Sequence, residues 1–188
     1  AFMALDGQDF NVQRHPTLLY RAFIANVPRI IQSGGKNDGE SITEPWIADL
    51  MSELVGVGDG DKVYDNACGM GILTSIATAA TGATAYIQDV YFQSAAVARI
   101  LMLMIGKPES VVSVGDSMLD PSIGGYNGPF DKFLIDAPFG IRTTQFKELP
   151  GYAEGHKASS GLTFDSEWAN DQWVFVRQAF KVLSEHGS

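Results

Sequence analysis

From Val63 to Gly71 the chain reads VYDNACGMG. A short run of β-favouring residues ends at a carboxylate, Asp65, and passes into a turn that contains Gly69 and Gly71. Glycine has no Cβ, so both positions allow another group to approach the backbone closely. The residues from Ile72 to Ala80 then predict a helix, whose first N–H groups face the turn. Strand, glycine turn and helix in this order are the setting that a nucleotide-binding loop requires.

The same alternation of short strands and helices continues along the chain. It favours an α/β fold with a parallel sheet covered by helices on both faces. We expect a helix that is capped by Thr43 and has Pro45 in its first turn. The other expected helices span residues 16–32, 72–80, 92–105 and 167–183, and the expected strands span residues 62–64, 83–88, 110–114 and 130–135.

Three carboxylates stand at the ends of three successive expected strands: Asp65, Asp89 and Asp116. In sheets of this kind, ligands bind at the carboxyl ends of the strands. A carboxylate such as Asp89 accepts hydrogen bonds from both hydroxyls of a ribose, which NAD and S-adenosylmethionine share. The third glycine of the dinucleotide fingerprint is absent, because Thr74 stands there. The three acids together favour S-adenosylmethionine, which carries an ammonium, a ribose and an adenine amine.

A second signature, Asp136-Ala137-Pro138-Phe139, follows the fourth expected strand. Together with the glycine turn and in this order, it resembles the adenine-N6 DNA methyltransferases, most closely the modification subunit of type I restriction systems. Thr43-Glu44-Pro45 is similar to the Thr-x-Pro segment that precedes the cofactor loop in these enzymes. The resemblance extends over about residues 41–183.

The resemblance implies a Rossmann-like, class I S-adenosylmethionine-dependent methyltransferase sandwich of three layers, which stops after the fourth strand and the following helix. It implies a domain at residues 41–188 after a helical extension at residues 1–40, and an unpaired sheet edge beside the fourth strand. The implied cofactor residues are Thr43, Pro45, Asp65, Ala67, Cys68, Gly69, Gly71, Asp89, Asp116 and Ser117.

The same resemblance implies the roles of the second signature. Asp136 and the carbonyl of Ala137 would accept hydrogen bonds from the target amine, Pro138 would shape the turn, and Phe139 would stack on a base flipped out of the duplex. The family pattern has two prolines, and Ala137 replaces the first of them. A similar tetrad in RNA cytosine-C5 methyltransferases ends in a nucleophilic cysteine, which Phe139 cannot replace.

Composition and charge set further expectations. The 188 residues suit one domain, and the net charge of −9 is unusual for a chain that contacts DNA phosphates. The DNA contacts would then lie mostly on a partner, such as a separate specificity subunit, beside a restriction subunit; a homodimer is left open. One cysteine and three histidines predict no metal site. No membrane span or signal peptide is visible, so we expect a cytoplasmic protein.

Three alternatives stay open at this stage. The chain could bind S-adenosylmethionine without turnover, as Ala137 suggests. It could methylate a protein glutamine or an RNA base, which the acidic charge favours. A nucleotide-binding oxidoreductase is disfavoured by the missing third glycine and by the Asp136 signature.

Overall fold

Four parallel strands form one sheet in the order β3-β2-β1-β4. The computed structural model describes residues 20–27, 42–117, 120, 123–126, 128–138, 175 and 179–188. The strands are β1 (Lys62–Asp65), β2 (Thr84–Asp89), β3 (Val111–Val114) and β4 (Lys132–Phe133). The parallel sheet expected from the sequence is confirmed.

The strand order reverses at β1. From β1 the chain runs through helix α3 (Ile72–Thr78), β2 and helix α4 (Phe92–Met104) to β3, and β4 then lies on the opposite side of β1. In open sheets of this kind, ligands bind at the carboxyl ends of the strands where the order reverses. The register pairs Tyr64 of β1 with Phe133 of β4, so the ends of these two strands meet at the point of reversal.

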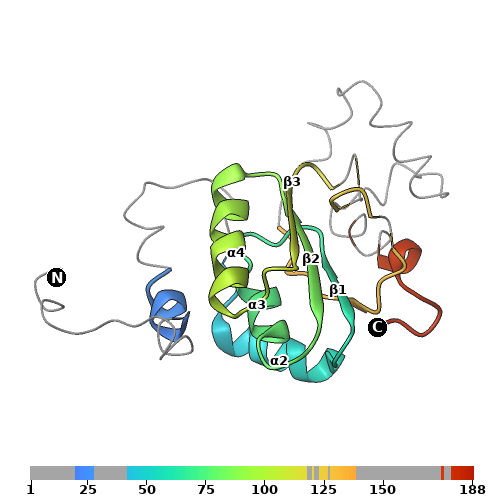
Figure 1. Ribbon diagram of the computed structural model, residues 1–188, viewed down its shortest axis with the longest axis horizontal. Coiled ribbons are helices and arrows are strands. Elements are labelled where there is room, and N and C mark those ends of the chain that lie inside the picture. The colour runs from blue at the N-terminus through green and yellow to red at the C-terminus, as the bar shows by residue number, and fades with distance from the viewer. Residues whose placement is uncertain are drawn as a thin grey trace, which may run out of the picture.

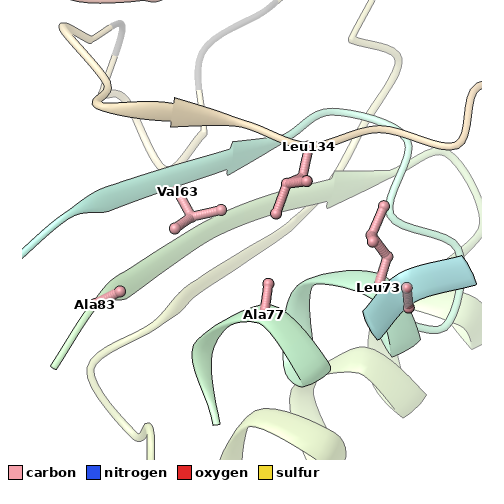
Figure 2. Packing of buried hydrophobic residues seen from close by; sticks show 6 residues of the cluster. Val63, Leu73, Ala77, Ala83 and Leu134 are labelled. Atoms are coloured by element: carbon pink, nitrogen blue, oxygen red, sulfur yellow. The ribbon is translucent and has the colours of Figure 1, made fainter. Parts of the chain in front are cut away.

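Helices α2 (Pro45–Val55), α3 and α4 cover one face of the sheet (Figure 1). Val63 and Leu134 point from the sheet toward Leu73 and Ala77 of α3, as Figure 2 shows, and all four are buried. Burial of a large aliphatic side chain contributes about 1.5–3 kcal/mol to folding. This packing fixes α3 against the sheet and thereby positions the turn that precedes it.

The opposite face of the sheet is aromatic. The rings of Tyr64 and Phe130 stack with their centroids 4.5 Å apart, and Tyr86 and Tyr126 extend the cluster. Val182, at the end of the helical residues 179–182, packs against it. In Figure 1 this helical segment lies across the sheet from α3 and α4. Helices on both faces make the three layers that the sequence predicted.

Residues 20–27 form a helix that packs against the same body. Its Tyr20, Ile24 and Val27 share a hydrophobic cluster with Ile72 of α3 and Leu101 of α4. The Tyr20 hydroxyl lies 2.8 Å from Ser75 Oγ. The rest of the helix expected over residues 16–32 lies outside the described residues, and the boundary at residue 40 stays a prediction.

The structure corrects the expected cap of α2. Glu44 occupies the N-cap position and no side chain caps the helix. The Thr43 hydroxyl instead donates a hydrogen bond of 2.8 Å to Asp136 Oδ2, so the prediction of Thr43 as a cap is wrong. The helix ends at Val55, and the C-cap residue Gly56 has a φ of 64°, which suits glycine.

The fourth strand is shorter than predicted, and its outer edge is paired. Only Lys132–Phe133 form a strand, although the Leu134 N–H still donates to the Tyr64 carbonyl at 3.0 Å. The Phe130 and Phe133 N–H groups donate to the carbonyls of Val182 and Ser188. The expectation of an unpaired edge is therefore wrong, because residues 182–188 run beside β4.

Candidate functional site

The turn after β1 is tied to the end of β2 by hydrogen bonds. The Cys68 N–H donates to the Gln88 carbonyl at 2.9 Å, and the Gly69 N–H donates to Asp89 Oδ2 at 2.8 Å. The Gly71 N–H closes the turn on the Cys68 carbonyl at 2.8 Å. The expected cofactor loop is therefore held in place by the strand that carries the expected ribose acid.

Asp89 is buried and fixed at both oxygens. Its Oδ2 accepts from Gly69, and its Oδ1 accepts from the Tyr91 N–H at 2.8 Å. The Gly115 N–H donates to the Asp89 carbonyl at 2.9 Å, which ties the loop after β3 to the same strand end. The partly buried Asp116 and the buried Ser117 follow in that loop.

Asp65 is completely buried beneath the turn rather than exposed in it. Its Oδ2 accepts from Thr74 Oγ1 at 2.6 Å and its Oδ1 from the Ala67 N–H at 3.3 Å. Burial raises the pKa of Asp65 to about 7, the Thr74 and Ala67 bonds oppose this, and the nearby Asp89 and Asp136 raise it further. The buried Asp65 carboxylate therefore stabilises the conformation of the turn through these hydrogen bonds.

The raised pKa makes stability depend on pH. The Asp65 carboxyl has a pKa near 3.8 in the unfolded chain, so the native state binds the carboxyl proton more tightly than the unfolded state does. Protonation of Asp65 therefore stabilises the native state. This stabilisation is complete below about pH 4 and is lost as the pH rises through about 7. An Asp65→Asn variant keeps the shape of the side chain without the charge. We expect its free energy of unfolding to match wild type near pH 4 and to exceed it above pH 7, by up to about 4 kcal/mol.

Urea titrations of both proteins at several pH values measure this difference. Because both proteins share every other titrating group, only the difference between them reports on Asp65. A constant difference across that pH range would show that Asp65 keeps an ordinary pKa in the native state.

Gly69 and Gly71 have different roles. Gly69 has a φ of 52° and a Cβ there would meet nothing within 4 Å. Gly71 has a φ of 76° and a Cβ there would lie 2.8 Å from Ala98 Cβ, in α4. Gly69 therefore leaves open space beside the turn, whereas Gly71 allows the start of α3 to approach α4.

The loop and the second signature line one pocket, which encloses about 390 Å³ including the part open to solvent. The lining residues come from the segment before α2, the turn, α3, α4 and the segment after β4: Ile42, Thr43, Ala67, Cys68, Gly69, Met70, Ile72, Ser94 and Asp136. Five of these were expected site residues, namely Thr43, Ala67, Cys68, Gly69 and Asp136.

Sequence reasoning missed Ile42, Met70, Ile72 and Ser94 as lining residues and Thr74 as the partner of Asp65. Met70 and Ile72 could have been inferred from their place beside Gly69 and Gly71. Ser94 had no such signal, because nothing in the chain before folding places α4 beside the turn.

The lining of this pocket does not include the other described residues expected at the site, namely Pro45, Asp65, Gly71, Asp89, Asp116, Ser117, Ala137 and Pro138. Pro45 opens α2, and Ala137 and Pro138 follow Asp136, all three partly buried. Phe139 lies outside the described residues. Burial, together with Asp65 and Asp89, raises the pKa of the Cys68 thiol well above its usual value. This pKa favours the neutral thiol, a weak nucleophile.

Within the described part of the chain, no group of three or more His, Cys, Asp or Glu side chains is arranged to hold a metal ion. No described helix combines the length and hydrophobicity that a bilayer crossing needs.

No protein-family model and no curated protein matches the sequence. Solved structures do match it. The type I restriction-modification methyltransferase subunit of Streptococcus thermophilus is 20% identical over 95% of this chain and 40% of its own, with a TM-score of 0.70. A modification subunit of a putative type I restriction enzyme from Vibrio vulnificus YJ016 is 18% identical over 98% of this chain and 39% of its own, with a TM-score of 0.71.

A third match is a S-adenosylmethionine-dependent methyltransferase from Geobacter sulfurreducens, crystallised with S-adenosylhomocysteine. It is 14% identical over 87% of this chain and 52% of its own, with a TM-score of 0.51. This chain has the fold of the S-adenosylmethionine-dependent methyltransferases. The Rossmann-like fold class predicted from the sequence is confirmed, and the chain spans about two fifths of the length of the two type I subunits.

Proposed function

We propose that this chain binds S-adenosylmethionine and methylates the N6 amine of adenine in DNA, as part of a type I modification subunit. The observation that carries the proposal is the shared pocket, which the turn after β1 and the Asp136 carboxylate after β4 line together. A methyl donor held by the turn and an amine held by Asp136 then meet in one cavity. The likeness of fold to two type I subunits supports the same assignment.

The residues around the turn suit this cofactor. The open space at Gly69 allows the methionine end to approach the backbone, with Ala67 and Cys68 beside it and Asp65 and Gly71 holding the turn in shape. In this proposal Thr43 and Pro45 also lie beside the methionine end of the cofactor. In this proposal Asp89 receives the ribose hydroxyls, and Asp116 and Ser117 receive the adenine. When bound, S-adenosylmethionine supplies an electrophilic methyl group on a sulfonium.

The chain's own contribution to the reaction is to hold the target amine. Asp136 and the Ala137 carbonyl accept its hydrogen bonds, while Pro138 shapes the turn and Phe139 stacks on the base. With the target amine held there, the cofactor at the turn would supply its methyl group to the amine nitrogen, and the amine would release one proton to solvent. The acceleration of methyl transfer comes mainly from positioning the two reacting groups, which can lower an activation barrier by several kcal/mol.

The net charge of −9 bears on the partners. DNA binding depends on Lys and Arg that neutralise phosphates. We therefore propose that double-stranded DNA is held mainly by a separate specificity subunit, with a restriction subunit completing a cytoplasmic complex. The same charge favours a second candidate function, methylation of a protein glutamine or an RNA base.

Calorimetric titration with S-adenosylmethionine, with NADH as the control ligand, tests the cofactor. We expect saturable binding of S-adenosylmethionine alone, and a loss of about tenfold or more in affinity in Asp89→Ala, because a buried carboxylate that accepts ribose hydroxyls is removed. Asp49→Ala, an exposed acid on α2, is the matched control and should bind as wild type does. Binding of NADH by the folded protein would instead support the oxidoreductase.

Transfer of a labelled methyl group identifies the substrate. The full-length protein, with and without its specificity subunit, is given unmethylated duplex DNA, RNA and a glutamine-containing protein in parallel. Label in DNA that digests to N6-methyladenine supports the proposal. Label only in RNA or protein supports the second candidate, and cofactor binding without transfer identifies an impaired subunit, the outcome that Ala137 suggests.

A further inference from the structure

Thr43 makes a contact that its place in the sequence does not predict. It precedes α2, and its hydroxyl lies 2.8 Å from Asp136 Oδ2 across a separation of 93 residues. Both side chains line the pocket beside Gly69. The Thr43 hydroxyl therefore connects the segment before α2 to the residue that the proposed function assigns to the target amine.

The surroundings of Asp136 explain why such a contact matters. Residues 134–138 have no regular secondary structure, and the Leu134 N–H donates to the Tyr64 carbonyl two residues before Asp136. An aspartate two residues beyond that bond can rotate about its side-chain torsions. A hydroxyl that donates to a carboxylate forms a charge-assisted hydrogen bond, which is stronger than one between neutral groups.

We infer that Thr43 is a positioning residue for Asp136. By donating to Oδ2 it holds the carboxylate in one orientation and leaves Oδ1 to accept from the target amine. This inference rests on the proposed function, and it replaces the contact with the cofactor that the Thr-x-Pro resemblance implies for this side chain. Thr43 can also hold the side chain in an Asp136→Asn variant, because the Thr43 hydroxyl can accept a hydrogen bond from the amide N–H.

Two substitutions in the full-length protein separate positioning from cofactor binding. Thr43→Val keeps the shape and removes the donor, whereas Thr43→Ser keeps the donor. We expect Thr43→Val to lower kcat by about 10- to 100-fold, the cost of a misplaced reacting group, and Thr43→Ser to recover most of the loss. The dissociation constant for S-adenosylmethionine should stay within about twofold of wild type in both variants.

A double-mutant cycle gives the second readout. In an Asp136→Ala background the hydroxyl has no carboxylate to orient, so Thr43→Val should lower kcat no further. Weaker cofactor binding with unchanged kcat at saturating cofactor would overturn the inference and return Thr43 to the cofactor site. Equal kcat in Thr43→Val and wild type would overturn it as well.

Crystal structures of the wild type and Thr43→Val provide a readout that does not need activity. The inference expects the Asp136 carboxylate to change rotamer or to lose order in the variant, and Thr43→Ser to restore it. An unchanged Asp136 in Thr43→Val overturns the positioning role whether or not the protein methylates DNA. Absence of methylation by the wild type, with Asp136 displaced in the variant, overturns the proposed function alone.

Discussion

Asp136→Ala is expected to lower the rate of methyl transfer by about 10²–10³-fold, the usual cost of removing one hydrogen-bonding group aimed at the reacting centre. The carboxylate lines the same pocket as the glycine turn, and in the proposed function it accepts a hydrogen bond from the target amine. Binding of S-adenosylmethionine should change by no more than about twofold, because the turn itself is untouched.

Asp136→Asn is the matched control for this prediction. The amide oxygen still accepts from the target, and the amide nitrogen donates to the Thr43 hydroxyl, whose present distance to Oδ2 is 2.8 Å. We expect a loss of about tenfold or less, because one neutral acceptor replaces a charged one. Single-turnover kinetics measure methyl transfer, and calorimetry measures the binding of S-adenosylmethionine. If Asp136→Ala loses cofactor binding as strongly as turnover, Asp136 belongs to the cofactor site instead.

Gly71→Ala is expected to destabilise the fold by about 2–5 kcal/mol, the sum of a left-handed backbone strain and an overpacked contact. The added Cβ would lie 2.8 Å from Ala98 Cβ and 3.1 Å from Ala98 Cα, so neither a rotamer change nor a small shift relieves it. Urea titration followed by circular dichroism measures the loss.

Gly69→Ala serves as the control for Gly71→Ala. Its φ of 52° imposes a similar strain, but its Cβ would meet nothing within 4 Å. We expect a cost in stability of about 1–2 kcal/mol from the backbone alone, together with weaker binding of S-adenosylmethionine, since the new methyl group occupies space that the ligand needs. Equal destabilisation by the two substitutions would mean that α3 and α4 are not packed as closely as the structure shows.

Much of the fold was predictable because it depends on local patterns. Alternation of short apolar runs with helical segments predicted a parallel sheet with helices on both faces, and β1, β2 and β3 were located within a residue or two. The strand–turn–helix setting of Gly69 and Gly71 was likewise visible, since backbone freedom at glycine is a property of the residue itself. The short β4 was overestimated, because apolar character continues to Ile135 after strand pairing ends.

The site was predictable only as a list of residues. Thr43 shows why: serine or threonine before a helix usually caps it, and the sequence contains no sign that a carboxylate 93 residues later would take the hydroxyl instead. The two glycines of one turn looked equivalent, and only the position of Ala98 in α4 separates them.

The sequence by itself determined the class of fold and the order of chemical groups at the strand ends, because hydrophobic periodicity and glycine turns act over a few residues. The tertiary structure alone decided that Asp65 is buried with a pKa near 7, that Gly71 lies against α4, and that Thr43 and Asp136 share a pocket with Gly69. The meeting of Asp136 with Thr43 and Gly69 depends on β4 lying on the far side of β1. The burial of Asp65 and the close approach of Gly71 depend instead on the packing of α3 and α4.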